Sequence, residues 1–316
     1  SRPNPHLAQY AERVFMPTIT VTSTETTRSS YQGNLDKWVF PTLGDTKLPE
    51  ITSAQLTALL VDMQKQKKAN STVVKVYTIL NSLFKMAYLS DMIDRNPMDK
   101  VQRPKPRKDE TKPTEAEAYT SQEMQAILAA LDGEPLKWRC FVRLLVDAGI
   151  RRGEACALQW KDIDMKAGTA LIHQNLCYTP SKGVYLDKPK NGRCRTVYLG
   201  DETLNLLRQL RSQQAEKAVS PFVFTQDGSP EPMHPTSPTH YFRQFAKRNN
   251  IQGFHPHKLR HSFASLAITA GADVASVSEV LGHSDKAVTL RMYTHSDDES
   301  RRRASQIVQE AINKAG

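Results

Sequence analysis

A stretch in the first half of the chain divides it into two parts that must fold around separate cores. Residues 101–118 read VQRPKPRKDETKPTEAEA, which is rich in proline and charge and has no apolar period. This composition predicts an extended linker. A length of 316 residues by itself favours about two domains. We therefore expect a first domain over residues 1–100, a linker over 101–118 and a second domain over 119–316.

The first part is patterned as a helical unit. Thr52 or Ser53 is placed to cap a helix with leucines at positions 56, 59 and 60. Ser71 precedes a longer helix whose apolar face runs from Val73 to Ala87. A shorter amphipathic helix follows the Thr/Ser-rich residues 18–30, and Asn96-Pro97 ends the pattern. Together these signals predict four or five helices.

The second part mixes helices with short strands. We expect strands at 170–172, 184–186, 196–199 and 222–224, with Asn191-Gly192 as a hairpin turn. Thr120 and Glu123 have capping-box spacing, and a buried helix from Trp138 ends at Gly149. The predicted fold class is mainly α, with a helical first domain and a mixed α/β second domain that holds a small antiparallel sheet.

The charge balance predicts an anionic partner. The formal net charge is +10 and the pI is about 9.4, with an excess of Lys and Arg in both parts. This favours nucleic acid, although a generally basic protein with solvated charges is the alternative. No apolar run approaches the roughly 18 residues of a membrane span and no signal peptide opens the chain, so we expect a cytoplasmic protein without membrane contact. The chain begins with Ser1, which is expected of a processed or trimmed N-terminus.

Cysteine usage gives no sign of a metal site. Cys140, Cys156, Cys177 and Cys194 are scattered without paired metal-type spacing, so we expect reduced, structural thiols. The sequence also holds no phosphate-binding glycine loop and no clear carboxylate cluster for two metal ions. We expect no cofactor.

The residues from His255 to His295 concentrate polar chemistry. They hold five of the nine histidines, and Tyr293. Pro256 and Gly271 bracket a helix on which His257 and Arg260 lie off the apolar stripe, and Gly282 ends a second helix and places His283 in a turn. A phenol can act as a nucleophile, and Arg and His donate to phosphate oxygens. This set favours phosphoryl transfer to tyrosine, although Tyr293 taken alone is more typical of a packing aromatic.

Arg151 is a second candidate phosphate ligand. It follows Gly149 at a junction between two predicted helices, and Glu154 lies three residues further on. An arginine there can direct its guanidinium at a phosphate while the carboxylate steadies a neighbouring group. The alternative is an ordinary arginine that pairs at a helix end.

These motifs resemble one known family. His257-Lys258-Leu259-Arg260-His261, Leu281-Gly282-His283 and Tyr293 are similar in order and spacing to the C-terminal signature of the tyrosine recombinase (phage integrase) family. Residues 149–154, GIRRGE, resemble its first arginine box, and residues 31–45 and 94–97 resemble its helical core-binding domain. The integrase branch of phages and conjugative transposons is the closest fit. The chain departs from the family at Ala148, where Thr is usual, and at Gln159, where Arg is frequent.

The resemblance implies a set of catalytic residues. Arg151 and Arg260 would bind the non-bridging oxygens of the scissile phosphate with His283, and Glu154 would support Arg151. His257 would assist proton transfer at Tyr293, which would form a 3′-phosphotyrosyl bond. Lys190 would be the general acid, with Lys188, two residues back on the same predicted strand face, as the competitor. The implied activity is site-specific cutting and rejoining of DNA that integrates and excises a mobile element.

The resemblance also implies partners. These are double-stranded DNA, further copies of the chain in an assembly expected to be a tetramer at synapsis, and accessory DNA-bending or excision proteins. The expected DNA-binding residues are Lys65, Lys67, Lys68, Lys75, Arg103, Lys105, Arg243 and Lys247, each of which is also typical of a solvated surface. The apolar stripe Ile307, Val308, Ala311 and Ile312 is expected to dock on a neighbouring protomer. Two alternatives remain, a type IB topoisomerase-like enzyme and a non-catalytic DNA-binding regulator.

Overall fold

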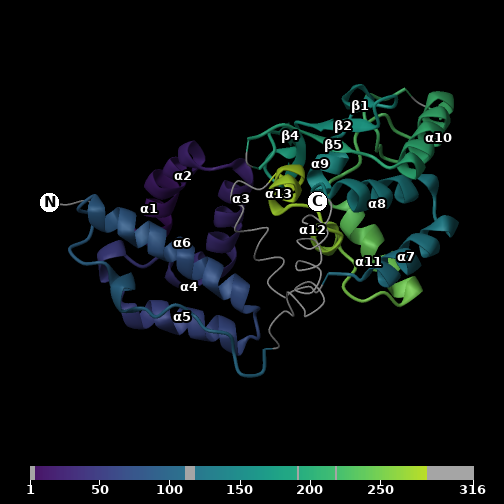
Figure 1. Cartoon of the computed structure of the whole chain (residues 1–316). Coiled ribbons are helices and arrows are strands. Elements are labelled where there is room, and N and C mark those ends of the chain that lie inside the picture. Colours follow the sequence, from purple (N-terminus) through teal and green to yellow (C-terminus); the bar gives the residue numbers. More distant parts are fainter. Residues whose placement is uncertain (1–3, 111–117, 191, 218, 283–316) are drawn as a thin grey trace, which may run out of the picture. The chain divides into compact units, whose positions relative to one another are not determined.

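A computed structural model describes residues 4–110, 118–190, 192–217 and 219–282 of the chain. The chain forms two compact units, one of Ser1–Thr114 with Thr179–Gly183 and one of Glu115–Tyr178 with Val184–Gly316 (Figure 1). Both are built mainly from helices, and short antiparallel strands occur in the later part of the chain, so the predicted fold class is confirmed. Among the described residues, no helix is long and apolar enough to cross a membrane.

The first unit consists of α-helices joined by short π- and 3-10-helical turns. Its elements are α1 (Leu7–Tyr10), the π-helical turn η1 (Ala11–Phe15), α2 (Met16–Thr22), α3 (Glu25–Asn34), η2 (Leu35–Val39), α4 (Phe40–Leu43), η3 (Leu48–Glu50), α5 (Ser53–Lys65), α6 (Asn70–Leu89) and η4 (Pro97–Lys100). The helix over α1–α2 was missed, because the start of the chain shows no clear apolar period. The predicted faces of α5 and α6 are confirmed: Leu56, Leu60, Val73 and Phe84 are buried in one apolar core.

The helix caps of this unit are partly those predicted. Thr52 caps α5 in a capping box with Gln55, as expected. The predicted Ser71 cap is wrong, because the cap position is Ala69 and α6 begins at Asn70, whose backbone N–H donates to Glu110 Oε1 at 2.7 Å. A carboxylate from 40 residues further along the chain therefore satisfies one of the free N–H groups at this helix start.

Residues 101–110 have no helix or strand, as expected of a linker, but they are packed against the first unit. Arg107 Nη1 donates to the Lys68 carbonyl at 2.6 Å, and Gln64 Nε2 donates to the Lys105 carbonyl at 2.9 Å. Val101 is buried in the core of the unit. This part of the predicted linker is thus anchored by specific hydrogen bonds to the end of α5.

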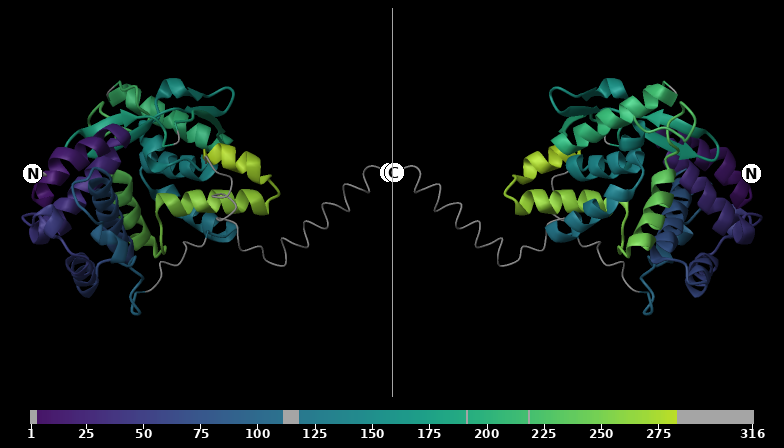
Figure 2. Two further views of the ribbon diagram at one scale, coloured as in Figure 1. Left: turned by 90° about the vertical axis from the view of Figure 1, so that its left-hand side faces the viewer. Right: turned by 90° about the vertical axis from the view of Figure 1, so that its right-hand side faces the viewer.

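The second unit is organised around α8 (Leu136–Ala148), which packs against α10 (Asp201–Lys217) and α12 (Pro256–Thr269). The other helices are α7 (Ser121–Ala130), η5 (Leu131–Gly133), α9 (Arg152–Ala157), η6 (Trp160–Asp162), α11 (Ser237–Asn249) and α13 (Val274–Leu281). The capping box of Thr120 with Glu123, the end of α8 at Gly149 and the end of α13 at Gly282 are confirmed. Figure 2 shows α12 and α13 side by side in both views.

Two small sheets accompany these helices. Strands β1 (Ile163–Asp164), β2 (Thr169–Ile172) and β5 (Arg195–Tyr198) form an antiparallel sheet in the order β1-β2-β5, in which Thr169 lies opposite Tyr198. Strands β3 (Asn175–Thr179) and β4 (Gly183–Asp187) form a separate pair. Ala170, Ile172 and Val197 face the apolar core, whereas Leu171, Thr196 and Tyr198 face outward.

Three strand predictions are wrong. The chain does turn at Pro189–Gly192, but Asn191-Gly192 does not close a hairpin, because β4 pairs with β3 and β5 pairs with β2. Lys188 and Lys190 lie beyond the end of β4 at Asp187, so they do not share a strand face. Residues 222–224 do not form a strand. Phe222 makes one isolated bridge, with Gln159, and Thr225 makes another, with Pro232.

Candidate active site

The predicted arginine box lies where α8 ends and α9 begins. Gly149 has φ +57°, in the left-handed region, and it ends α8. Arg151 then precedes the first turn of α9, and its backbone N–H donates to Glu154 Oε2 at 2.9 Å. Its Nη1 donates to Glu154 Oε1 at 3.0 Å, and its side chain is 19% exposed. Arg151 and Glu154 therefore form the supported pair that the sequence predicts.

Arg195 binds the same carboxylate and was not predicted. It lies on β5, and its Nη1 and Nη2 donate to Glu154 Oε1 and Oε2 at 3.1 and 2.6 Å. This is the two-pronged geometry for which a guanidinium is suited. Glu154 is fully buried. Burial raises the pKa of Glu154, but the hydrogen bonds and charges of Arg195 and Arg151 outweigh it, so that the pKa lies below its ordinary value.

Arg260 comes to the same place from α12. Its side chain is buried, which corrects the expectation that it lies on a different face of the helix from the apolar residues. Nη1 donates to the Gly149 carbonyl and Nη2 to the Leu281 carbonyl, both at 2.6 Å. Burial lowers the pKa of Arg260 to about 9, as does the nearby Arg151, so the group stays cationic at neutral pH.

The last turn of α13 joins all three arginines. The carbonyl of Val280 accepts from Arg195 Nε at 2.5 Å, that of Leu281 from Arg260 at 2.6 Å and that of Gly282 from Arg151 Nη2 at 3.4 Å. The final carbonyls of a helix have no partner within the helix and carry partial negative charge. They therefore suit cationic donors, and here three consecutive carbonyls bind three different guanidinium groups.

His257 lies in the first turn of α12 with an exposed side chain. Partial loss of hydration lowers the pKa of its imidazole below the ordinary 6.5, and the charges of His255, Arg260, Arg152 and Arg151 add to this effect. The ring is therefore neutral at pH 7 and able to accept a proton. The charges of Arg151 and Arg260 both act on this ring, so His257 lies near the arginine cluster.

The remaining predicted catalytic residues are Lys190 with its competitor Lys188, His283 and Tyr293. Lys190 and Lys188 are exposed between β4 and β5. His283 and Tyr293 lie outside the described residues, as does the predicted docking stripe at 307–312. His283 directly follows Gly282, the left-handed residue that ends α13.

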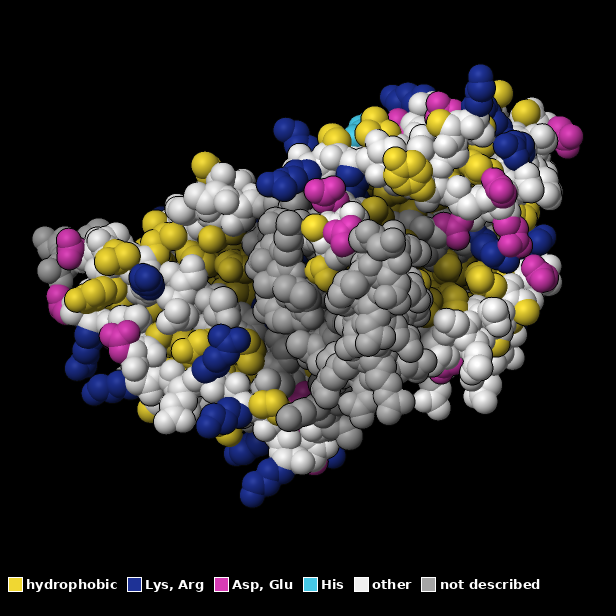
Figure 3. All heavy atoms as spheres, in the orientation of Figure 1, with side chains coloured by type: hydrophobic (Ala, Val, Ile, Leu, Met, Phe, Trp, Pro, Cys, Tyr) yellow, Lys and Arg dark blue, Asp and Glu magenta, His cyan; other side chains and the backbone are white. Residues whose placement is uncertain are grey.

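The predicted DNA-binding residues are mostly on the surface. Lys65, Lys67, Lys75, Arg103 and Lys105 of the first unit, and Arg243 and Lys247 on α11, are exposed. Lys68 is half-buried and its ammonium lies 5.1 Å from the centre of the Trp38 ring. Figure 3 shows Lys and Arg side chains on both units, interspersed with acidic and uncharged side chains.

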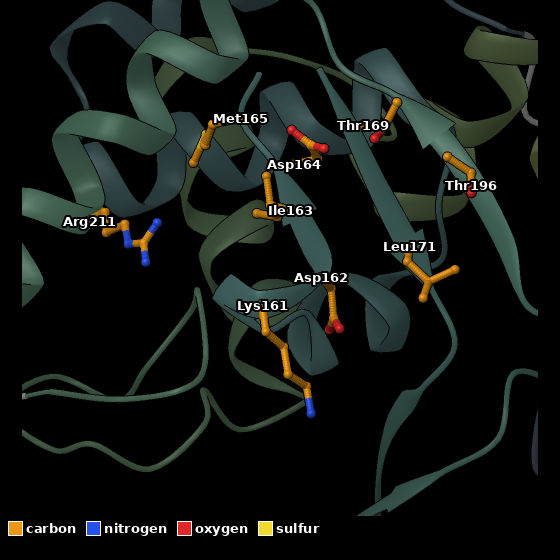
Figure 4. A pocket seen from close by; sticks show the side chains of 9 residues that line it. All are labelled: Lys161, Asp162, Ile163, Asp164, Met165, Thr169, Leu171, Thr196 and Arg211. Atoms are coloured by element: carbon orange, nitrogen blue, oxygen red, sulfur yellow. The ribbon is translucent and has the colours of Figure 1, made fainter. Parts of the chain in front are cut away.

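A hollow on the sheet lies on the opposite side from the arginine cluster. Figure 4 shows its lining, which includes Leu171 of β2 and Thr196 of β5. Thr196 follows Arg195 along β5, so the two side chains point to opposite faces. Asp162, which also lines the hollow, pairs with His173 at 3.0 Å. Among the described residues, no group of three His, Cys, Asp or Glu is placed to hold a metal ion.

The arrangement suits the binding of an oxyanion. Arg151 and Arg195 bind the Glu154 carboxylate, and Arg260 is joined to them through the end of α13, so the cluster carries an excess of positive charge in a place largely removed from water. Fixed donors of this kind stabilise negative charge that develops on a reacting group. A neutral imidazole lies beside them. These features are those expected at a site that acts on a phosphate.

Comparison with known proteins identifies the family. Residues 117–300 match the phage integrase family, and residues 8–103 match the phage integrase central domain. A tyrosine recombinase of Thermosipho africanus is 27% identical over 242 residues, which are 76% of this chain and 77% of the relative. The ICEBs1 integrase of Bacillus subtilis is 24% identical over 257 residues, covering 78% of this chain and 68% of the relative.

A solved structure shares the fold over nearly the whole chain. The Tn1549 transposon integrase, in complex with a circular intermediate DNA, superposes with a TM-score of 0.79 at 20% identity. The match covers 97% of this chain and 99% of that one. Since the family match alone spans more than half of the sequence, the chain belongs to the phage integrase family and is a tyrosine recombinase.

Proposed function

We propose that this recombinase integrates and excises a mobile element by cutting and rejoining double-stranded DNA through a 3′-phosphotyrosyl intermediate. The observation that carries the proposal is the cluster in which Arg151 and Arg195 bind the buried Glu154 and Arg260 is joined to them at the end of α13. It is supported by relatives from mobile elements, the ICEBs1 integrase and the Tn1549 integrase bound to a circular intermediate DNA.

Each residue has a chemical task in the proposed step. The Tyr293 oxygen attacks the phosphorus as the bond from phosphorus to the 5′ oxygen breaks, and His257 takes the phenolic proton. Arg151, Arg260 and His283 bind the non-bridging oxygens. Lys190 gives a proton to the departing 5′ oxygen, with Lys188 as the competing general acid. Rejoining reverses the step and needs no ATP, because the phosphodiester energy is kept in the protein–DNA bond.

The proposed partners are DNA and further copies of the chain. A lambda integrase has been solved as a tetramer bound to a Holliday junction. We expect the same assembly here, with accessory DNA-bending or excision proteins. The exposed cations Lys65, Lys67, Lys75, Arg103, Lys105, Arg243 and Lys247, with Lys68, contact phosphates, and the protein works in the cytoplasm on the nucleoid. In this proposal residues 1–100 bind the core of the site and residues 119–316 carry the chemistry.

A covalent-trapping experiment tests the proposed chemistry. The protein is incubated with a chelator and a pool of duplexes whose sequence around a nick is randomised, so that cleavage releases a short fragment and prevents rejoining. We expect a protein–DNA band on a denaturing gel, absent with Tyr293→Phe. Sequencing of the trapped DNA yields the preferred site. If duplex is bound but no covalent band forms, the proposal is wrong and a non-catalytic regulator is favoured.

The selected site then separates a recombinase from a topoisomerase. A recombinase exchanges strands only between two copies of the site, whereas a topoisomerase-like enzyme relaxes a supercoiled plasmid without paired sites. We expect recombinant products from a two-site plasmid. Relaxation that is independent of the site, without exchange, would favour the topoisomerase.

The nicked duplex of the trapping experiment also distinguishes the two lysines. Replacing the 5′ bridging oxygen by sulfur gives a leaving group that needs no general acid. We expect Lys190→Ala to lose cleavage of the oxygen substrate and to recover it with the sulfur substrate, while Lys188→Ala behaves like the unmodified protein. The opposite pattern would assign the acid to Lys188.

A further inference from the structure

We propose that Arg195 is a positioning residue for DNA cleavage, which holds Glu154 and the last turn of α13 so that the Arg151 guanidinium and the segment leading to His283 keep their places. The inference rests on the proposed cleavage reaction and assigns a task to a residue outside the predicted catalytic set. It is carried by the contacts that Arg195 makes with two other segments of the chain.

The guanidinium of Arg195 is committed to protein groups. Nη1 and Nη2 donate to the two Glu154 oxygens, and Nε donates to the Val280 carbonyl, so each of its nitrogen atoms has a protein acceptor. Its side chain is 9% exposed, against 19% for Arg151. Arg195 therefore acts through its neighbours, and Arg151 is the better placed of the two to reach a phosphate.

The sheet gives Arg195 a rigid base. Its side chain lies on the same face of β5 as Val197, which is fully buried, and β5 is paired with β2 along its length. Gly282 packs directly on the guanidinium, since a Cβ there would lie 3.0 Å from Arg195 Nη1 and 3.2 Å from Cζ. The contact thus ties three segments together: the sheet, the first turn of α9 and the end of α13.

Loss of Arg195 changes what Glu154 does. The carboxylate is fully buried, and without Arg195 its remaining side-chain partner is Arg151. A buried carboxylate that loses one cationic partner either draws the remaining cation closer or takes up a proton. In both cases the Arg151 guanidinium leaves its position, and the carbonyl of Val280 loses a donor. DNA binding, which depends on many phosphate contacts, should change little.

The first test compares Arg195→Gln and Arg195→Lys with Arg143→Gln, a control in the same unit. Arg143 pairs with Glu202 at 2.7 Å between α8 and α10, so its variant also loses an ion pair. On the nicked substrate chosen with the unmodified protein, we expect both Arg195 variants to cleave about tenfold to a hundredfold more slowly in a single turnover, with DNA affinity kept. Loss of a residue that orients a metal ligand has an effect of this size. Arg143→Gln should cleave normally.

Arg195→Lys separates the effect of charge from the effect of hydrogen-bond geometry. It keeps the positive charge but cannot bind both carboxylate oxygens and the carbonyl. Thermal unfolding of each variant is measured first, and if Arg195→Gln does not fold, the comparison rests on Arg195→Lys. Normal cleavage by Arg195→Lys would overturn the inference, because charge alone would then be sufficient.

The second test asks whether the effect passes through Glu154. Arg151, Arg195 and, at longer range, Arg260 are the charged groups that face this carboxylate. In Arg195→Gln the Glu154 carboxyl group should titrate at higher pH. The midpoint of the acid side of the pH–rate profile for cleavage should therefore move to higher pH. In the double variant with Glu154→Gln the limb should return, and the double variant should be no slower than Arg195→Gln.

The outcomes separate the two proposals. If the unmodified protein forms no covalent complex with any duplex, the proposed function itself is wrong. If the unmodified protein cleaves and the losses from Arg195→Gln and Glu154→Gln simply multiply, Arg195 acts independently of Glu154 and the inference is overturned.

Discussion

At the residue scale, the three arginines differ in how much of each guanidinium remains for a phosphate. Arg260 uses Nη1 and Nη2 to hold two backbone carbonyls and is 4% exposed. Arg195 is held by Glu154 and Val280, while Arg151 keeps the most exposed side chain of the three. Arg260 is thus a link between α8 and α13, and in the proposed mechanism it supplies fixed positive charge near the reacting phosphate.

Substitution of Arg151 or Arg260 by Lys should slow cleavage sharply. Loss of a donor directed at developing charge costs about two to three decades in rate, and a lysine cannot bind two carbonyls in the plane of a guanidinium. Single-turnover cleavage of the DNA site selected in the trapping experiment measures this loss of rate, with Arg143→Lys as the control. A loss of less than about threefold, well below that range, would remove Arg151 or Arg260 from the proposed set.

Cleavage should fall on the acid side of a midpoint below pH 6.5. The pKa of His257 is lowered by partial burial and by the neighbouring cations, so the proton-accepting imidazole is present above that pKa and is lost as pH falls through it. The pH–rate profile of the unmodified protein shows this limb. The residual activity of His257→Asn should lack it, and a limb that persists in this variant would assign the titration to another group.

The sequence predicts Arg151, Glu154, His257 and Arg260 because they lie in short motifs whose spacing is fixed along the chain. It does not reveal Arg195, because the contact joins residues 41 apart and the residues 195–198, RTVY, are those of an ordinary strand. The one available signal was alternation: an arginine on the same strand face as a buried valine needs a buried partner.

At the element scale, two glycines shape the ends of helices at the site. Gly149 and Gly282 have φ of +57° and +64°, and each ends a helix. A Cβ at Gly149 would lie 2.6 Å from Phe263 Cδ1 and 2.9 Å from Leu281 Cδ2. The turn after α8 is thus packed against α12 and α13 with no room for a side chain.

Gly149→Ala should lower the free energy of unfolding by about 2 kcal/mol or more, from the left-handed backbone and from the displaced core side chains. Chemical denaturation of the full chain measures this. The control is Gly133→Ala, where a Cβ has no neighbour within 4 Å. Equal stability of the two variants would show that the contact at Gly149 relaxes without cost.

The cap supplied by Glu110 should matter to the first unit. Glu110→Ala frees the Asn70 N–H at the start of α6 and should cost about 1 kcal/mol, the usual value for a helix cap. Asp109→Ala is the control, because Asp109 is 62% exposed and bonds only Arg107 among the described residues. If both variants unfold at the same temperature, residues 101–110 do not stabilise the unit through this cap.

Helices were easier to predict than strands for a physical reason. Caps such as Thr52 and Thr120 and stops such as Gly149 act within a few residues, so the sequence carries them locally. Strand β3 was missed because Leu176 and Cys177 are both buried, which destroys the alternation of a half-buried strand. The pairing of β5 could not be predicted, because its partner is β2, which no local turn can reveal.

At the scale of the whole molecule, the proposed reaction needs more than one copy of the chain. Exchange between two DNA sites requires several active sites held in register, and in the proposed mechanism one chain supplies the phosphate-binding residues of one active site. The apolar residues Ile307, Val308, Ala311 and Ile312 lie in sequence after Tyr293. We assign them to docking between protomers on DNA.

Deletion from Ser305 onward should therefore separate cleavage from recombination. The shortened protein should form the covalent complex on a single nicked site but give no recombinant product from paired sites. A second variant replaces Ile307 and Ile312 by Asp in the full-length chain, which disrupts the apolar stripe and keeps the length. It should show the same loss of recombination. Unimpaired recombination by either protein would contradict the docking role.

The most direct measurement is identification of the residue that carries the DNA. The covalent complex formed on the trapped site is digested with nuclease and protease, and the peptide that bears the nucleotide remnant is sequenced by mass spectrometry. We predict a 3′-phosphate joined to the oxygen of Tyr293, with no such peptide from Tyr293→Phe. Attachment to another residue, or through a 5′-phosphate, would contradict the proposed mechanism.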